Sequence, residues 1–588
     1  MSLVESINSF PSDVVEHYIY AVAFSLIVIG LLWGIFRATY VFGSIVLFLV
    51  AAKLMNINLI YEAAVNSSVL TVMLLISFTG VLKKEMLFEH LFDRLKMGKK
   101  AFLLFLTSSA ALGSSVINNT PVVSLLTPVV RDYCLKNGWN PKQFLLPISF
   151  AAVAGGTITL IGTSTNLVLN GMMEENNIAG FEFFEFCIPG IAVTLGVLIL
   201  NYFLPSKLYK TTITIKPQTS RVRDYTTELR VIPQGTIDGL TVKQAKLRGL
   251  KEMFLVSLLR NGTEIAPVTP ETVLIKNDSL FFTGSVNSVS NLLDLYPKGL
   301  TSIEERLEIE PSSNLIEAII PNNSTLVGRK IKESDFRNKY DAVIIGIQRN
   351  GRPISGQLGE FILKAGDLLL LSVGMHFYSK NKNASSLMLV SNHKRIGTKR
   401  KAREPFFFPL LVGILLFAFI LKWTVLFTVA LMILCTVFCG ITHFDNLKRD
   451  FNLQLYALLV LSVAFGSAIV NGHHADYFLN MVKLPDTSTS AILCVFGLTV
   501  ILTNFMTNVS AVTVVFPLGV AITNHYNINP HDVFLPIAFA ASASFLTPSS
   551  YQTHLIVQGA GSYSNREFIK LGLPTLVIYC TIALLILL

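Results

Sequence analysis

Two short stretches of otherwise apolar sequence contain clusters of amide and hydroxyl side chains. The residues concerned are Ser114, Asn118, Asn119 and Thr120 in the first stretch, and Thr503, Thr507 and Asn508 in the second. Oxygen atoms of such side chains, and carbonyl oxygens freed where a helix breaks, are the ligands that hard cations prefer. The free N–H groups at the start of a helix instead attract an anion. The two stretches are therefore candidates for binding both a cation and an anion.

Helical spacing predicts which of these side chains lie together. Ser114 and Asn118 are four residues apart, so we expect them on one helix face, and Thr503 and Thr507 repeat this spacing. Neither stretch contains Asp or Glu, although a proton relay inside a membrane usually uses a carboxylate. This favours Na⁺ as the bound cation, held by neutral ligands, and it favours an anionic over a cationic partner molecule.

The composition predicts an integral membrane protein. The chain has 588 residues, of which 52% are hydrophobic and 14% charged, whereas soluble domains carry about 25% charged residues. The net charge of +10 is best explained by basic cytoplasmic loops, so we expect no nucleic-acid partner. The N-terminus lacks the basic start of a cleavable signal, and we expect the cell (plasma or inner) membrane as the location.

Apolar segments long enough to cross a bilayer, about 20 residues each, occur in two groups. The expected crossings are 18–36, 40–58, 67–82, 143–171 and 184–204 in the first group, and 406–421, 423–441, 453–471, 533–559 and 568–588 in the second. The two clusters interrupt further apolar stretches at 101–130 and 490–522, which we interpret as re-entrant hairpins. The fold class is thus a polytopic α-helical membrane protein with ten crossings and two hairpins.

The distribution of charge predicts the orientation of these crossings. Segments 83–100 and 131–142 are basic and therefore expected inside, while 173–182 is acidic and expected outside. This arrangement places the N-terminus outside and the charged region 206–404 in the cytoplasm.

The two membrane regions, 1–205 and 405–588, resemble each other in sequence. Matched residues at an offset of 389 are Asn119 with Asn508, Pro128 with Pro517, and Pro147 with Pro536. After a slip of one residue, 163–171 lies over 551–559. Five crossings in each copy give the copies opposite orientations, the inverted-repeat pattern of secondary transporters, whose binding sites form where broken helices meet. The sequence therefore predicts a transporter.

These paired motifs resemble the divalent anion/sodium symporter superfamily. The hairpin tips match its Ser-Asn-Thr signature at 118–120 and 507–509, and the following breaks match at 155–166 and, more loosely, at 547–554. The resemblance implies a homodimer in which the hairpin domain moves like an elevator. It also implies two Na⁺ sites, formed by Ser114, Asn118, Asn119 and Gly162, and by Thr503, Met506, Asn508 and Ser550. The substrate would lie near Asn119, Thr120, Thr163, Asn508, Val509 and Tyr551.

Three departures from the family pattern bear on the substrate. Val509 replaces a threonine, and Tyr551 and His554 replace smaller residues, so we include His554 among the residues that could face the anion. The added bulk favours a compact anion. The large inserted region resembles that of sulfate transporters in the superfamily, so the resemblance, together with Val509 and Tyr551, implies sulfate, an inorganic divalent anion, with a dicarboxylate as the alternative. An intramembrane hydrolase is disfavoured because no nucleophile, base and acid occur at suitable spacings, so we expect no enzyme.

The inserted region 206–404 is itself repeated at an offset of 89, with domains at about 222–300 and 308–380. Both copies contain a predicted strand, Asn-Gly turn and strand, and they resemble the RCK-C (TrkA-C) domains of potassium-channel regulators. The two domains could form a dimerisation platform or act as a sensor for a small regulatory ligand, and the sequence leaves both roles open. The chain lacks a Gly-x-Gly-x-x-Gly fingerprint beside these domains, so we expect no organic cofactor. An ion channel gated by these domains is a further alternative, although no TVGYG filter occurs.

Overall fold

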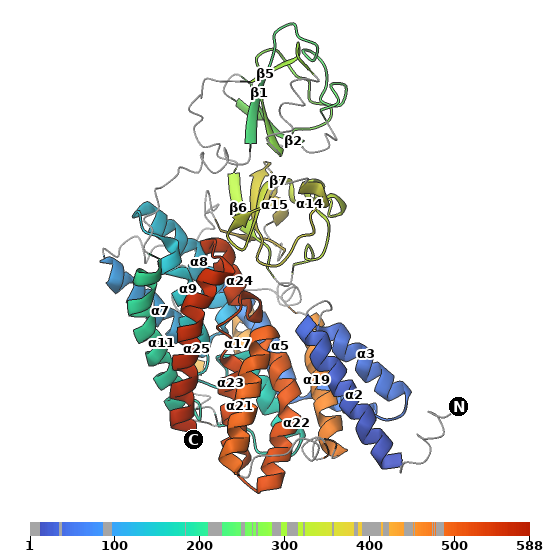
Figure 1. Cartoon of the computed structure of the whole chain (residues 1–588), viewed down its shortest axis with the longest axis vertical. Helices are drawn as coiled ribbons and strands as arrows, with labels where there is room; N and C mark the ends of the chain where they lie inside the picture. The colour runs from blue at the N-terminus through green and yellow to red at the C-terminus, as the bar shows by residue number, and fades with distance from the viewer. Residues whose placement is uncertain are drawn as a thin grey trace.

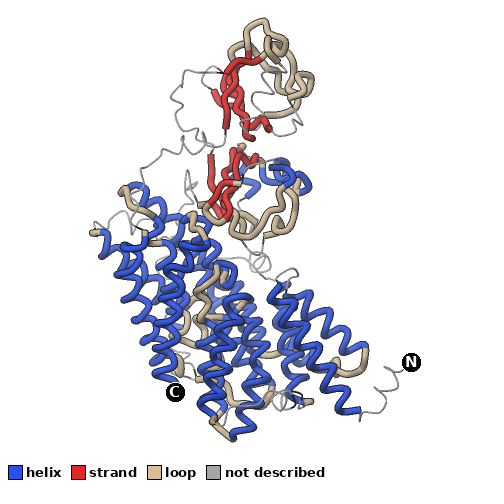
Figure 2. Tube along the Cα trace, in the orientation of Figure 1, coloured by secondary structure: helices blue, strands red, loops and turns tan. Residues whose placement is uncertain are grey.

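The protein consists of a helical body with two small β-sheets stacked beyond one of its ends (Figures 1 and 2). The computed structural model describes residues 12–33, 38–85, 97–182, 184–209, 226–247, 253–260, 263–265, 268–284, 296–302, 315–321, 324–354, 358–374, 376–381, 386–390, 413–414, 421, 423–439, 451, 453–472, 474, 477 and 487–588. The C-terminus lies at the end of the body away from the sheets (Figure 1).

The helices of the first half are α2 (Ser12–Trp33), α3 (Ala38–Ala51), α4 (Asn58–Val65), α5 (Ser67–Glu85), α7 (Lys99–Val116), α8 (Asn119–Lys136), η1 (Pro141–Gln143), α9 (Leu145–Gly155), α10 (Ser164–Glu175) and α11 (Cys187–Leu208). Those of the second half are α17 (Val425–Phe438), α19 (Leu453–Asn471), α21 (Ser488–Phe505), α22 (Asn508–Tyr526), α23 (Pro530–Ser542), η4 (Pro548–Ser550), α24 (Gln552–Gly561) and α25 (Asn565–Leu587).

Within the described residues, five helices have the length and apolar character needed to cross a membrane, and a sixth span results if the bent pair α4 and α5 counts as one. The predicted crossing 453–471 coincides with α19. The predicted crossings 143–171 and 533–559 are each interrupted, because a break separates α9 from α10 and α23 from α24. Most of the predicted crossing 406–421 lies outside the described residues.

Two Asn-Pro pairs, 389 residues apart, begin helical segments in the same way. The side chains of Asn140 and Asn529 accept hydrogen bonds from the backbone N–H groups two residues later, at 3.0 and 3.1 Å. Asparagine at the cap and proline in the first turn both favour helix initiation, so these residues determine where η1, which leads into α9, and α23 start.

The helices that follow the two breaks pack across the halves. Helix α10 of the first half contacts α22 and α23 of the second, and α24 of the second half contacts α8 and α9 of the first. Helices α11 and α25 pack against each other between the halves. The helix after each break therefore packs against the hairpin of the opposite half.

The described part of the inserted region contains ten strands, which are β1 (Thr226–Val231), β2 (Met253–Arg260), β3 (Thr263–Ile265), β4 (Ser279–Gly284), β5 (Leu300–Ser302), β6 (Leu315–Ile319), β7 (Ala342–Arg349), β8 (Arg352–Pro353), β9 (Leu368–Val373) and β10 (Met388–Leu389). They form two antiparallel sheets with the orders β3-β2-β4-β1-β5 and β10-β6-β9-β7-β8, which are the same topology read in opposite directions. The second sheet extends to Leu389, beyond the expected domain end at 380.

The predicted strand pairs of the insertion are confirmed, since β2 pairs with β3 and β7 with β8. Each domain contains a matching internal ion pair. Arg260 binds Asp278 in the first domain, and Arg349 binds Asp367 in the second, each at 2.7 Å. The sequences TVKQAKLR (241–248) and KIKESDFR (330–337) each predict a short helix. The first prediction is wrong, because the described part of that segment forms turns. The second helix is present in part, as η2 (Ile331–Glu333) and the start of α14 (Phe336–Tyr340).

The second sheet domain packs directly on the helical body. Ile319, Leu368 and Val390 belong to the same buried apolar cluster as the helices of the body. Arg131 of α8 forms an ion pair with Glu317 of β6, and their side chains are only 5% and 7% exposed. Breaking one partner of such a buried pair costs about 3–5 kcal/mol. This domain is therefore firmly attached to α8.

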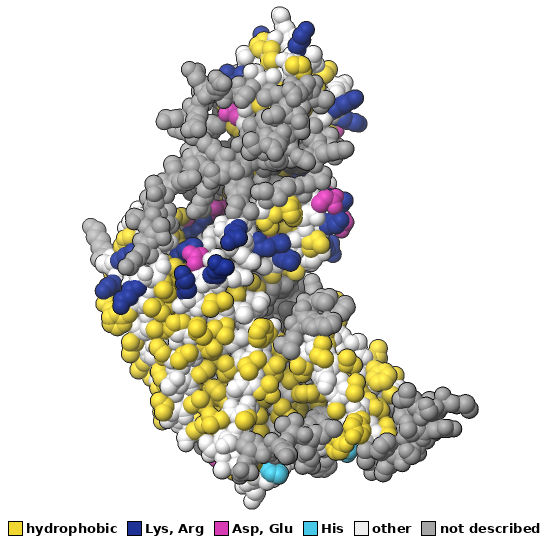
Figure 3. All heavy atoms as spheres, in the orientation of Figure 1, with side chains coloured by type: hydrophobic (Ala, Val, Ile, Leu, Met, Phe, Trp, Pro, Cys, Tyr) yellow, Lys and Arg dark blue, Asp and Glu magenta, His cyan; other side chains and the backbone are white. Residues whose placement is uncertain are grey.

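The surface of the body has the character of a lipid-facing protein. Hydrophobic side chains cover most of its visible face, and Lys and Arg side chains gather at the end next to the sheets (Figure 3). Lys99 at the start of α7, Lys136 in the last turn of α8 and Lys207 in the last turn of α11 are basic residues at helix ends.

Candidate binding site at two helix tips

The first tip is the link between α7 and α8. Helix α7 ends at Val116, and Ile117 and Asn118 are extended before α8 begins at Asn119. Because the helix ends before Asn118, the expectation that Ser114 and Asn118 share a helix face is wrong. The hydroxyl of Ser114 instead hydrogen-bonds the side chain of Asn119.

The second tip has the same geometry. Helix α21 ends at Phe505, Met506 is extended, and Thr507 caps α22 by accepting a hydrogen bond from the backbone N–H of Ser510. The expected pairing of Thr503 with Thr507 is therefore also wrong. The hydroxyl of Thr503 donates to Asn508 Oδ1 at 3.0 Å, and this pair lies 389 residues after Ser114 and Asn119.

Oxygen atoms converge around Asn119 at the first tip. The amide atom of Asn119 that faces Ser114 lies 3.2 Å from the carbonyl oxygens of both Ala152 and Gly162. With the amide oxygen in this place, four oxygen atoms meet and only the Ser114 hydroxyl supplies a proton. With the amide nitrogen there, the same carbonyls accept hydrogen bonds. The cluster can therefore be satisfied either by an N–H donor or by a cation.

The first break, which packs against this tip, requires glycine at two positions. A Cβ atom on Gly156 would lie 2.3 Å from the Asn119 amide oxygen, and one on Gly162 would lie 2.4 Å from the carbonyl oxygen of Gly156. Real Cβ atoms do not approach this closely, so both glycines are needed for the break to lie against the tip.

A second cluster of oxygen atoms surrounds Thr503. Its hydroxyl oxygen lies 3.0 Å from Asn508 Oδ1 and 2.5 Å from the carbonyl oxygen of Ala541. One hydroxyl proton can serve only one of these two acceptors. The carbonyl of Ala541 is 389 residues after that of Ala152, so both clusters draw a carbonyl from the end of the helix before the break.

Matching hydrogen bonds fasten each break to its tip. The hydroxyl of Thr159 donates to the carbonyl of Ser115, and that of Thr547 donates to the carbonyl of Asn504, each at 2.5 Å. In the second half, Asn504 also receives the backbone N–H of Leu546 at 2.8 Å. The sequence reasoning missed these residues, although the 389-residue offset could have paired Ser115 with Asn504.

The two asparagines differ in the partner of their second amide atom. The second amide atom of Asn119 lies 2.9 Å from the Tyr551 hydroxyl, with which it hydrogen-bonds in either orientation of the amide, and this contact links the first tip to the second break. Asn508 Nδ2 is buried and has no hydrogen-bond partner among the described residues. An unpaired buried donor is costly, so this nitrogen is suited to an acceptor brought by a ligand.

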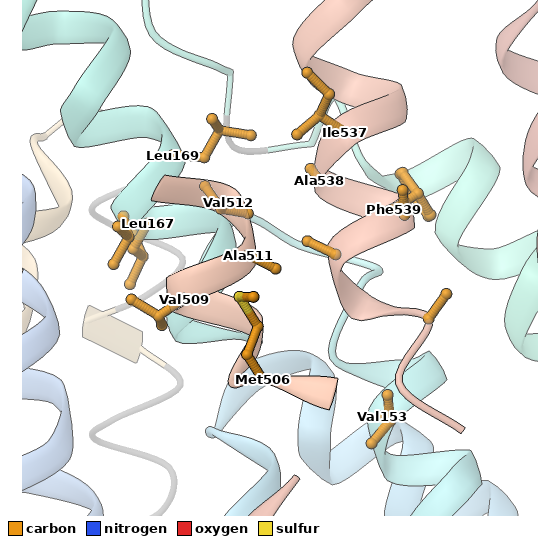
Figure 4. Packing of buried hydrophobic residues seen from close by; sticks show 14 of the residues in the cluster. Val153, Leu167, Leu169, Met506, Val509, Ala511, Val512, Ile537, Ala538 and Phe539 are labelled. Atoms are coloured by element: carbon orange, nitrogen blue, oxygen red, sulfur yellow. The ribbon is translucent and has the colours of Figure 1, made fainter. Parts of the chain in front are cut away.

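An apolar group lies beside the second tip. Val509 is buried in a cluster that includes Met506, Val512 and, from α10 of the other half, Leu167 (Figure 4). The side chain of Val509 offers no hydrogen bond at the position where the related motif has a threonine hydroxyl. The second tip is consequently the less polar of the two.

The remaining predicted site residues lie at these tips and breaks. Thr163 caps α10 and is buried, and Thr120, in the first turn of α8, is partly buried. Asn118 does not cap α8 with its side chain. The hydroxyl oxygen of Ser550 lies 3.0 Å from the carbonyl oxygen of Ser544 and 2.6 Å from that of Thr547, within the second break.

His554 is fully buried and both of its ring nitrogens have partners. Nδ1 lies 2.8 Å from the Ser149 hydroxyl, and Nε2 lies 2.8 Å from the carbonyl oxygen of Ser544. These contacts point to the break and to α9, so the ring has no free nitrogen for an anion.

Apolar helices, paired breaks and oxygen-lined tips together define an integral membrane transporter. The chain belongs to the citrate transporter (CitMHS) family, whose model matches residues 24–518. Family membership confirms the prediction that the protein is a transporter and not an enzyme.

Related proteins agree with this assignment. A candidate sulfur deprivation response regulator of Chlamydomonas reinhardtii is 29% identical over 483 residues, which cover 78% of this chain and 82% of that protein. Sodium/sulfate cotransporter 1 of the same organism is 27% identical over 298 residues, which are 46% of this chain and 33% of that protein. The match thus spans only a third of that cotransporter.

One solved structure with a similar arrangement is the crystal structure of the YdaH transporter of Alcanivorax borkumensis. It has a TM-score of 0.43 and 11% sequence identity, with coverage of 89% of this chain and 84% of that chain.

Proposed function

We propose that the protein is a secondary active transporter that couples Na⁺ to the symport of a small divalent anion, most simply sulfate. The observation that carries this proposal is the pair of buried asparagines. Each places one amide atom in a cluster of oxygen atoms, and Asn508 presents an unpaired N–H donor on its other side. The similarity to a sodium/sulfate cotransporter supports both the ion and the anion.

The two oxygen clusters are the proposed Na⁺ sites. The first uses Ser114, Asn118, Asn119 and Gly162, and the second uses Thr503, Met506, Asn508 and Ser550. To these the structure adds the carbonyl oxygens of Ala152 and Ala541, which lie within reach of the paired side chains. Neutral oxygens at such distances suit a hard monovalent cation, which needs no carboxylate partner.

The asparagine amides explain how cation and anion binding are coupled. An Na⁺ ion in the first cluster requires Asn119 to point its oxygen inward, and Nδ2 then points towards Tyr551 and the space between the tips. Without the cation, the nitrogen is better placed on the carbonyls and the oxygen faces outward, where it repels an anion. Na⁺ binding therefore turns Asn119 into an anion donor.

The proposed substrate site lies between the tips, at Asn119, Thr120, Thr163, Asn508, Val509 and Tyr551. Tyr551 reaches across from the second break to Asn119, and Val509 adds no donor. Such a site suits a compact anion better than one that needs a hydrogen-bonded carboxylate at each end. Because its nitrogens are engaged elsewhere, His554 is not part of this proposed set.

A carboxylate substrate is the second candidate. The family model that matches this chain is described as a citrate transporter, which favours a di- or tricarboxylate. Competition separates the candidates: sulfate uptake blocked by selenate and thiosulfate but not by succinate or citrate supports sulfate, and the opposite pattern supports a carboxylate.

The decisive experiment is uptake of labelled sulfate into proteoliposomes that contain the purified protein. We expect uptake to require an inward Na⁺ gradient and to collapse when choline replaces Na⁺. Uptake that continues unchanged without Na⁺ would falsify the proposed coupling. Conductance far above transporter turnover would instead revive the channel alternative.

We further propose that the second inserted domain regulates transport through its attachment to α24. Ser562 donates to Gln348 at 2.9 Å, and Ile319 packs against Gly559. The domain therefore contacts α24, the helix that begins beside Tyr551. The first domain has Arg230 and Ser279 where the second has the paired Ile319 and Leu368. Its equivalent surface is therefore too polar for the same attachment.

The buried Arg131–Glu317 pair provides the test of this regulatory role. Glu317→Lys should detach the domain and alter the maximal uptake rate, and the charge-swapped pair Arg131→Glu with Glu317→Lys should restore it. Glu360→Gln, in an exposed ion pair of the same domain, serves as the control. Equal rates in all variants would refute the coupling.

Membrane orientation, assembly and movement are further parts of the same proposal. The gathering of Lys and Arg at the sheet end supports a cytoplasmic location for the inserted domains, and thus an outside N-terminus. A homodimer and an elevator-like movement of the hairpins follow from the superfamily resemblance. Light scattering of the purified protein and state-dependent crosslinking of the tips to α5 and α19 would test them.

A further inference from the structure

His554 lies in an apolar pocket with two directed hydrogen bonds. The rings of Phe150 and Phe568 meet it edge-on at centroid distances of 5.3 and 5.4 Å, and the ring of Phe545 is 6.4 Å away. Since the carbonyl of Ser544 can only accept, Nε2 carries the proton, and Nδ1 accepts from the Ser149 hydroxyl. A neutral imidazole thus satisfies every polar atom of this contact without burying a charge.

The carbonyl that His554 binds belongs to the second break, beside the proposed second Na⁺ site. The same oxygen of Ser544 lies 3.0 Å from the hydroxyl of Ser550, a proposed ligand, whose other acceptor is the carbonyl of Thr547 at 2.6 Å. The neighbouring carbonyl of Ala543 is held by Asn504 at 3.0 Å. Successive carbonyls of this break are therefore fixed by side chains from different helices, as ligand geometry requires.

The first half places a different residue at the same position. Asn166 aligns with His554, and its Nδ2 donates to the carbonyl of Thr159 in the first break at 3.3 Å. Both residues hold a break carbonyl, but only the longer imidazole also reaches Ser149 on α9 of the opposite half. His554 therefore joins the second break to the helix that carries Ala152, a carbonyl of the first cluster.

We propose that His554 is a positioning residue for the second Na⁺ site, which it connects through Ser149 to the first half of the protein. This inference rests on the proposed Na⁺-coupled function and assigns His554 to the cation rather than to the anion. Removing the imidazole frees the Ser544 carbonyl and lets Ser550 move away from its ligand position. Na⁺ affinity should then fall, while the anion donors stay in place.

The test measures the Na⁺ dependence and the sulfate dependence of uptake separately. In His554→Leu we expect the Na⁺ concentration for half-maximal uptake to rise about tenfold, which corresponds to the loss of a buried hydrogen bond. The KM for sulfate at saturating Na⁺ should change less than about twofold. His554→Asn, which copies Asn166, should recover most of the Na⁺ affinity. Ser149→Ala should produce a smaller rise of the same kind.

A distant histidine serves as the control. His525→Leu, at the end of α22 and away from the break, should leave both dependences unchanged. A raised sulfate KM with unchanged Na⁺ dependence in His554→Leu would overturn the proposed role, as would an unchanged Na⁺ dependence in Ser149→Ala if the leucine variant does not fold. Sodium-independent uptake by the unmodified protein would instead overturn the proposed function itself.

Discussion

The two tips share a hydrogen-bonding scheme but differ in the partner of the second amide atom and in the residue that follows the asparagine. In both, a hydroxyl residue near the end of one helix meets the first asparagine of the next, beside a carbonyl from the following helix. At the first tip Tyr551 bonds the second amide atom of Asn119, whereas at the second tip Asn508 Nδ2 has no partner in the described part of the chain and Val509 is apolar. The hydroxyl, asparagine and carbonyl that both tips share suit the binding of two identical cations. The residues in which the tips differ are suited to selecting the anion.

Removing either asparagine should have the largest effect. Asn119→Ala and Asn508→Ala each delete a cation ligand and an anion donor, so we expect sulfate uptake to fall more than about 100-fold. Asn137→Ala, just after α8, is the matched control and should retain uptake. If either tip variant transports at the normal rate, that tip is not part of the site.

A change confined to the first tip should reveal how far the tips depend on each other. Gly156→Ala places a Cβ atom against the Asn119 amide, and a displacement of this size should lower uptake about 10- to 100-fold. Gly497→Ala, on α21 with no atom within 4 Å of the new Cβ, should be neutral. Equal activities of the two variants would mean that Asn119 tolerates displacement.

Opening the space beside the first tip should change the substrate preference. Tyr551→Thr removes the ring and frees Asn119 Nδ2, so we expect succinate and citrate to compete about tenfold better against sulfate. Uptake competition measures this ratio, with the exposed Tyr40→Thr as the control. An unchanged ratio would show that Tyr551 does not restrict the substrate.

Making the second tip more like the related motif should have the smallest effect. Val509→Thr adds a hydroxyl beside Asn508, and we expect a gain of about threefold in dicarboxylate competition. Val65→Thr, at an exposed position of α4, controls for the substitution itself. A loss of sulfate uptake without any gain for dicarboxylates would contradict the role given to Val509.

The sequence predicted the positions of both tips and both breaks, because asparagine and proline inside an apolar segment mark the points where a membrane helix is interrupted. It paired Ser114 with Asn118 incorrectly, since the spacing rule assumes that the helix continues beyond Val116. It also missed the carbonyls of Ala152 and Ala541, because a backbone ligand leaves no mark on residue type. Finding them required the three-dimensional packing of α9 and α23 against the tips.

The inserted region shows the same division between local and long-range information. Its hairpins were predicted from Asn-Gly turns and alternating strands, which are local signals. Its attachment to the body depends on Glu317 meeting Arg131 and on Ile319 meeting Gly559. These contacts join residues far apart in the chain, and no local pattern identifies them.

The attachment also constrains how the protein is made. The second domain is complete once residue 390 has been synthesised, but α24 begins at Gln552. At about 5–20 residues per second, ribosomes need roughly 10 to 30 s for the intervening chain. During that interval Ile319 has no Gly559 to pack against, whereas Glu317 can already reach Arg131. We therefore expect docking in two stages, with the ionic contact first and the apolar contact only when the last helices enter the membrane.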